Sequence, residues 1–218
     1  MTSYQNLLLL QNLYRLKAVG FEHIDPLTVN LRNDQMLPSD METLKQMIGT
    51  CHLCDLSKSR SQAMPGIGSP DAEVMIVDAY VSMAEDESGH YFAGRSGLSL
   101  KKMIENVLKL PAERIFLTHA VKCKPSGSKL PSASEWNSCK PYLFRQIELV
   151  DPKIVVALGS DAYRLLTEDT TAFDQVRGQK IAFGNRTLIP IYHPQYLLRN
   201  PSLKQVTLHD LNTIKSCL

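Results

Sequence analysis

Short apolar runs alternate with helical patterns from about residue 72 to the end of the chain. The runs are rich in Val, Ile and Leu without strict alternation, which is typical of strands buried on both faces; they cover residues 73–77, 114–121, 153–158 and 188–192. Helical patterns lie between them, at residues 99–108, 134–150 and 160–166. This alternation predicts an α/β fold with three layers, α/β/α, around a mostly parallel, four-stranded sheet.

The first part of the chain has a different, purely helical pattern. Residues 4–18 repeat Leu at three- and four-residue spacings, which predicts an amphipathic helix. Ser39 and Glu42 form the pattern of a capping box, which predicts a second helix that runs through Ile48. We therefore expect a helical N-terminal extension at residues 1–45 and one domain at residues 46–218.

The predicted sheet indicates where chemistry should be sought. Ligands of open parallel sheets bind beyond the carboxyl ends of the strands. In this chain the segments that follow the four predicted strands are residues 78–86, 122–131, 159–160 and 193–201.

Composition narrows the class of protein. Among 218 residues, 44% are hydrophobic and 21% are charged, a composition typical of globular proteins. No apolar run approaches the roughly 20 residues that a membrane helix needs. The N-terminus lacks the pattern of a secretory signal, so we expect a cytoplasmic protein. The stretch from Arg95 to Arg145 contains ten basic residues and three acidic ones. Such an excess either forms one anion-binding face or is scattered over several faces.

Four of the five cysteines form a pattern that needs an explanation. Disulfides are rare in cytosolic proteins. A thioredoxin-type pair follows a strand, whereas the first pair here follows a helix, and the second pair is too wide for a zinc knuckle. An iron–sulfur cluster accepts wider spacing, so the pattern favours a metal site and mildly favours iron over zinc. The four are Cys51, Cys54, Cys123 and Cys139, whereas Cys217 lies in the C-terminal tail.

Short motifs then follow one another in a fixed order from about residue 46 onward. They are Cys51-His-Leu-Cys-Asp-Leu56 with Arg60, Pro65-Gly-Ile-Gly68, Gly89-His-Tyr-Phe-Ala-Gly-Arg-Ser-Gly97, Thr118-His-Ala-Val-Lys-Cys123 and His193-Pro-Gln-Tyr-Leu-Leu-Arg199. In this order and spacing the chain resembles the iron–sulfur uracil-DNA glycosylases, often called family 4.

The resemblance implies a uracil-DNA glycosylase-like fold and hydrolysis of the bond between uracil and deoxyribose in base excision repair. Such an enzyme flips the nucleotide out of the duplex. By resemblance, Phe92 stacks on the base, His193 stabilises negative charge on the departing uracil, and Glu85 steadies the sugar or orients water. A [4Fe-4S] cluster is implied on Cys51, Cys54, Cys123 and Cys139. We expect a monomer that acts on uracil-containing DNA and does not associate with membranes.

Some positions depart from the family pattern, and they fall in the base-binding segments. The family's Gly-Glu pair is Asp78-Ala79 here, a small residue is replaced by Tyr80, and the Asn that reads uracil is His119. A neutral imidazole has one donor and one acceptor, but on opposite edges of the ring. Two alternatives therefore remain: a degenerate member that binds DNA or a partner without excision, and a glycosylase for another damaged base.

Contacts with the DNA backbone are predicted for two loops. Lys124, Lys129 and Arg199 suit phosphate groups. Leu197 or Leu198 either wedges into the gap left by the flipped base or anchors its loop to the core.

Overall fold

The computed structural model describes residues 14, 17, 37–127 and 130–218. The chain divides into two units, Met1–Met36 and Leu37–Leu218. The predicted helix at residues 4–18 lies outside the described residues except for Tyr14 and Lys17, which are helical. The expected domain boundary after residue 45 stays a prediction, and the fold below is that of the second unit.

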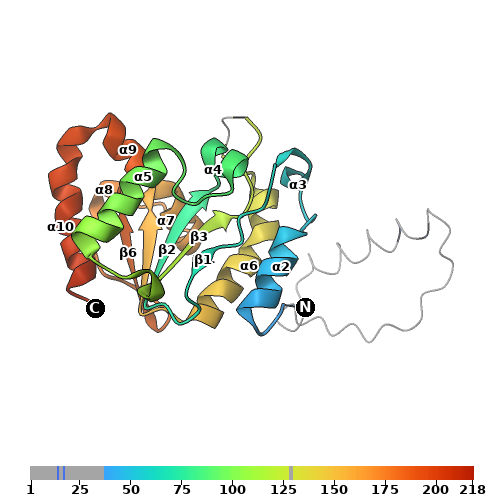
Figure 1. Ribbon diagram of the computed structural model, residues 1–218, viewed down its shortest axis with the longest axis horizontal. Helices are drawn as coiled ribbons and strands as arrows, with labels where there is room; N and C mark the ends of the chain where they lie inside the picture. The colour runs from blue at the N-terminus through green and yellow to red at the C-terminus, as the bar shows by residue number, and fades with distance from the viewer. Residues whose placement is uncertain (1–13, 15–16, 18–36, 128–129) are drawn as a thin grey trace. The chain divides into compact units, whose positions relative to one another are not determined.

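The described residues form one six-stranded sheet in the order β1-β3-β2-β4-β6-β5 (Figure 1). Its four central strands are parallel, as expected, and lie close to the predicted runs: β2 (Val74–Tyr80), β3 (Ile115–Val121), β4 (Ile154–Leu158) and β6 (Arg186–Ile191). The predicted number of four strands was wrong, because two antiparallel edge strands flank them. These are β1 (Ile67–Gly68) and β5 (Ile181–Phe183), which are too short to give a hydrophobic pattern.

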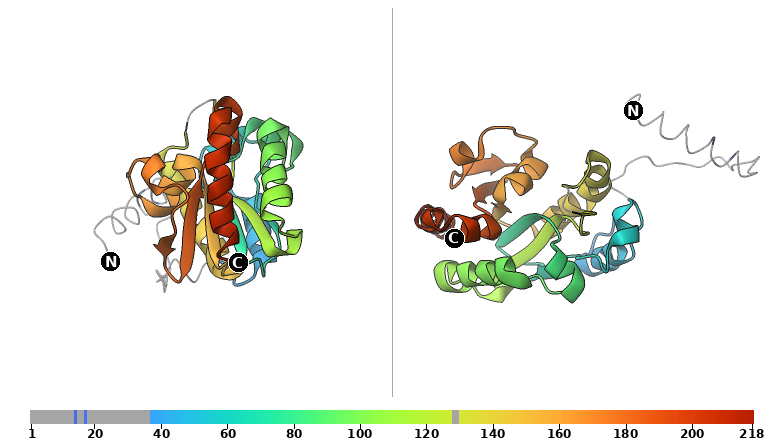
Figure 2. Two further views of the ribbon diagram at one scale, coloured as in Figure 1. Left: turned by 90° about the vertical axis from the view of Figure 1, so that its left-hand side faces the viewer. Right: turned by 90° about the horizontal axis from the view of Figure 1, so that it is seen from above.

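Helices cover both faces of the sheet (Figures 1 and 2). Successive strand residues point to opposite faces, so Met75 and Val77 of β2 belong to one apolar cluster and Val74 and Ile76 to the other. The first cluster is completed by α2 (Met41–Gly49), α6 (Ala133–Val150) and α7 (Gly159–Thr167). The second is completed by α5 (Gly94–Lys102), the π-helical η2 (Met103–Leu108) and α10 (Lys204–Lys215).

Short helices connect these elements. They are α3 (Leu56–Ser59), α4 (Met83–Ser88), η3 (Ala112–Arg114), α8 (Phe173–Val176), α9 (Pro194–Arg199) and η4 (Pro201–Leu203). Among the described residues, no helix combines the length and apolar character needed to cross a membrane.

The N-terminal cap of α2 differs from the one predicted from the sequence. The cap of α2 is Asp40, whose carboxylate accepts the Thr43 N–H at 2.8 Å, so the predicted capping box at Ser39 was wrong. Asp is as good a cap as Ser, and here it lies one residue closer to the first helical turn. Ser82 and Glu85 form a capping box that was not predicted. It begins α4, beside the site described next.

Candidate active site

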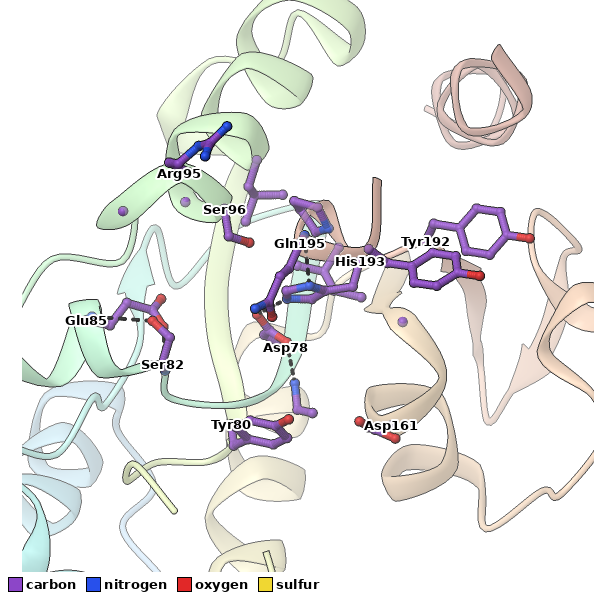
Figure 3. A pocket seen from close by; sticks show the side chains of 18 of the residues that line it. Asp78, Tyr80, Ser82, Glu85, Arg95, Ser96, Asp161, Tyr192, His193 and Gln195 are labelled. Atoms are coloured by element: carbon purple, nitrogen blue, oxygen red, sulfur yellow. Dashed lines mark hydrogen bonds and ion pairs between the residues drawn. The ribbon is translucent and has the colours of Figure 1, made fainter. Parts of the chain in front are cut away.

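A cavity of about 770 Å³ opens at the carboxyl ends of β2, β4 and β6, where a parallel sheet is expected to bind its ligand (Figure 3). We call it the His193 cavity. Three of the four segments expected to carry chemistry line it, namely 78–86, 159–160 and 193–201. The described residues of segment 122–131 do not line it, because β3 ends on the side of the sheet where the cysteines lie.

His193 is held at both ring nitrogens. It caps α9, and its Nδ1 accepts the Gln195 N–H at 3.1 Å, while Nε2 lies 3.0 Å from Asp78 Oδ2 (Figure 3). In the neutral ring Nδ1 is therefore the acceptor, and Nε2–H donates to the carboxylate. Asp78 is held in turn by the Ala79 N–H, which donates to Oδ1 at 2.7 Å.

The pairing of His193 with Asp78 changes the protonation of both groups. Burial alone would lower the pKa of His193, but the nearby carboxylates of Asp78, Glu85 and Asp161 together outweigh burial and raise it. Burial alone would raise the pKa of Asp78, but His193, His119 and the Ala79 N–H together outweigh burial and lower that pKa. The cavity therefore favours the ionised carboxylate and extends the pH range in which the imidazole is cationic.

Close packing against α7 fixes where the imidazole sits. Gly159 has a φ of +82°, and a Cβ added there would lie 3.0 Å from the Cβ of His193. Only glycine combines this backbone conformation with so close an approach.

A second imidazole–carboxylate pair lies beside the first. His119 stands opposite Asp78 in the β2–β3 register, and its Nε2 is 3.2 Å from Glu85 Oε1. The other oxygen of Glu85 accepts the Ser82 N–H at 2.9 Å, so both carboxylate oxygens are engaged. His119 is buried, and its Nδ1 has no hydrogen-bond partner among the described residues. Its one unused polar atom is therefore an acceptor when Nε2–H donates to Glu85.

The aromatic residues are arranged differently from the prediction. Phe92 does not line the His193 cavity, so the structure does not bring it together with His193; its half-buried ring packs against the apolar cluster of α5 and α10. Tyr91 lines the cavity instead and stacks on His119, with ring centroids 5.4 Å apart. Tyr80 lines the cavity as well. Tyr91 could have been found, since it precedes Phe92 in the same glycine-flanked loop.

The residues predicted to contact DNA do not all lie at the same site. Arg199 is exposed and lines the His193 cavity, Lys124 is half-buried outside it, and Lys129 lies outside the described residues. Leu197 is buried and anchors its loop, whereas Leu198 is exposed.

Several residues of the basic stretch are engaged elsewhere, which favours the scattered arrangement. Lys122 is buried, Arg114 pairs with Glu73 at 2.8 Å, and Lys140 pairs with Glu168 at 2.6 Å.

The four predicted ligand cysteines line one small pocket together with Arg60, Lys122 and Tyr142. We call it the cysteine pocket. Among the described residues, no three His, Cys, Asp or Glu side chains are grouped closely enough to hold a single metal ion. The donor set nevertheless fits a larger sulfur-ligated group, because N–H donors already face the sulfur atoms. Arg60 Nη1 donates to Cys123 Sγ at 3.0 Å, and the Lys122 N–H donates to Cys139 Sγ at 3.3 Å.

Lys122 links the cysteine pocket to His119 on β3. Its backbone contacts Cys139, while its buried Nζ donates to Thr118 Oγ1 at 2.7 Å and to the His119 carbonyl at 2.5 Å. Nζ also donates to the side chain of Gln146. Burial lowers the pKa of Lys122 to about 7.

Comparison with known proteins agrees with this geometry. The profile described as "Uracil DNA glycosylase superfamily" matches residues 65–212. The type-4 uracil-DNA glycosylase of Sulfurisphaera tokodaii is 33% identical over 80% of this chain and 83% of its own. Those of Saccharolobus solfataricus and Thermotoga maritima are 32% and 31% identical, over 82% and 81% of this chain and 87% and 93% of their own. Because the profile matches more than half of the chain and these relatives are 31–33% identical over about 80% of it, the chain belongs to the uracil-DNA glycosylase superfamily.

Proposed function

We propose that this chain is a uracil-DNA glycosylase that flips uracil out of DNA and hydrolyses its N-glycosidic bond in base excision repair. The observation that carries the proposal is His193, held at the cavity by Asp78 and Gln195, in a chain of this superfamily. The relatives named as type-4 uracil-DNA glycosylases support the same activity.

His193 is the proposed donor to the departing uracil. Bond cleavage leaves negative charge on the base, and an imidazole N–H that faces a carbonyl oxygen of the base stabilises it. In the free protein this donor is engaged by Asp78, so the substrate oxygen must replace the carboxylate at Nε2. Asp78, once released, is an ionised group beside the sugar, where it can steady positive charge or orient water.

Glu85 was predicted to act directly, and its geometry supports a positioning role as well. Its two oxygens hold His119 and the first turn of α4. His119 does not line the cavity, and we propose that Glu85 holds it behind the wall, where its ring supports Tyr91. Stacking on the base is proposed for Phe92 by resemblance and for Tyr91 by position, and Tyr80 closes the side of the cavity.

The cofactor proposed here is a [4Fe-4S] cluster, which Cys51, Cys54, Cys123 and Cys139 would hold. When bound, it would cross-link helix α6 to the loops that carry the other three ligands and stabilise the fold. Arg60 would neutralise thiolate charge at Cys123. Lys124, Lys129 and Arg199 are the proposed phosphate contacts of a monomeric enzyme.

The decisive experiment uses purified protein and an oligonucleotide with a single uracil, followed by alkali to cleave abasic sites. We expect strand scission, and His193→Ala should lower its rate by about 10²- to 10³-fold, the usual effect of removing such a donor. His209→Ala is the matched control, because His209 is exposed on α10 and does not line the cavity. Tight binding without scission would instead indicate a degenerate member, and scission at a different lesion would indicate another substrate.

A further inference from the structure

The His193 cavity is larger than the flipped base requires. Its volume of about 770 Å³ lies in the range of pockets that enclose a drug-sized ligand. The residues assigned above, Asp78, Tyr80, Glu85 and Tyr91, make up only part of its lining. A second wall lies on the other side of His193 from Glu85 and includes Tyr192 (Figure 3).

An aromatic series forms this second wall. Phe173 of α8, Tyr192 at the end of β6 and Tyr196 of α9 all line the cavity. Ring centroids are 5.7 Å apart between Phe173 and Tyr192 and 5.3 Å apart between Tyr192 and Tyr196, the latter with planes inclined by 30°. These distances and angles are those of favourable aromatic contacts.

The middle ring of the series is rigidly held. The Tyr192 hydroxyl donates to Asp174 at 2.6 Å, and the Arg177 guanidinium lies over its ring, 5.5 Å from the centroid. Arg177 is itself held by Asp210 at 2.6 Å. Tyr196 stacks on this fixed ring and is 48% exposed. A ring braced on one side and open on the other is a surface on which a flat ligand can stack at little entropic cost.

Charge at the cavity suits a nucleotide. Arg95 and Arg199 are exposed, line the same cavity, and form no ion pair with any described residue. Arg199 lies in the same short helix as Tyr196. Two acids in this part of the lining, Asp161 and Asp174, also form no ion pair with a described residue. Asp174 accepts the Tyr192 hydroxyl, and Asp161 lies on the other side of His193 from Arg95 (Figure 3). A phosphate is therefore expected near the arginines and away from Asp161.

We propose that Tyr196, braced by Tyr192, stacks on the base of the nucleotide next to the flipped one, with Arg199 on the phosphate between them. This second nucleotide subsite rests on the proposed function, because it places DNA in the same cavity. Stacking on aromatic rings is the usual way to bind unpaired bases. The subsite therefore favours substrates whose neighbouring base is unpaired.

The test measures binding separately from excision. A single-stranded oligonucleotide carries 2-aminopurine beside a cleavage-resistant 2′-fluoro-2′-deoxyuridine, and emission is followed as the protein is added. Wild type should quench the emission by stacking. Tyr196→Ala should abolish the quenching and weaken binding about 5- to 150-fold, whereas Tyr196→Phe should keep both. Leu208→Ala, which removes an exposed side chain of α10 that does not line the cavity, should behave as wild type.

The outcomes distinguish this proposal from the proposed function. Quenching and affinity unchanged in Tyr196→Ala would overturn the subsite even if uracil is excised normally. Quenching that depends on Tyr196 in a protein that releases no uracil supports the subsite while the excision proposal fails. Melting curves of both Tyr196 variants establish that loss of binding is not loss of fold.

Discussion

The cysteine pocket and the His193 cavity were both predicted from motifs, but the structure brings the predicted residues together more completely in the first than in the second. All four predicted cysteines line one pocket, although 88 positions separate the first from the last. In the His193 cavity, Phe92 does not reach the lining, and His119 and Glu85 bind each other.

The difference reflects chemistry. Cysteine serves few purposes in proteins, so four cysteines in a family pattern indicate one site. Histidine and carboxylate side chains serve many purposes, and they can satisfy one another. The pairs Asp78–His193 and Glu85–His119 depend on the strand register and on a helix cap, neither of which a motif records.

The largest effect is expected from Cys139→Ser, which breaks the cysteine pocket. We expect loss of iron and of visible absorbance, and a fall in Tm of roughly 10 °C or more, since each lost kcal/mol costs a chain of this size about 2–4 °C. Iron analysis and thermal melting measure both. Cys217→Ser, in the C-terminal tail, should keep the iron and the Tm. A Cys139→Ser protein with its full iron content would refute the proposed ligand set.

A smaller effect is expected where the two regions meet, at Lys122. Lys122→Met removes the ammonium and leaves the oxygens of Thr118, His119 and Gln146 without its hydrogen bonds, at a cost of about 1–3 kcal/mol for each buried group left unpaired. We expect Tm, iron content and excision rate to fall together. Lys101→Met, on the surface of α5, is the control. If excision fell while iron and Tm stayed as in wild type, the two regions would be independent.

The smallest effect is a shift in pH dependence, confined to the His193 cavity. Asp78→Asn removes the charge that raises the pKa of His193, so that pKa should fall to its ordinary 6.5 or below, where burial drives it. NMR titration of the imidazole measures the change.

The sign of the stability change follows from the same pair. His193 contributes stability that is complete below pH 6.5 and is lost as pH rises through its raised pKa. Asp78 contributes stability that is complete above pH 3.8 and is lost as pH falls through its lowered pKa. The free energy of unfolding of the wild type should therefore exceed that of Asp78→Asn by the largest amount between pH 4 and 6.5. If the difference in free energy of unfolding between the two proteins were the same from pH 4 to 9, the ionisation of this pair would not contribute to stability.

Much of the fold was predictable because its signals are local. The four parallel strands are long apolar runs, and the helical patterns at residues 134–150 and 160–166 correspond to α6 and α7. The edge strands β1 and β5 are too short to have a pattern, and their pairing depends on neighbours distant in sequence. The second wall of the cavity was missed for a similar reason. Tyr192 and Tyr196 flank His193, but only the tertiary fold brings Phe173 to them.

Strand β3 has a consequence for how this protein can change over time. His119, which pairs with Glu85 of the cavity lining, and Cys123, in the cysteine pocket, are four positions apart, and Lys122 between them contacts both His119 and Cys139. A single inserted or deleted residue in this interval would turn the following side chains to the opposite face of the sheet. The segment is therefore constrained in length as well as in side chains, and an insertion here should displace Lys122 and Cys123 together.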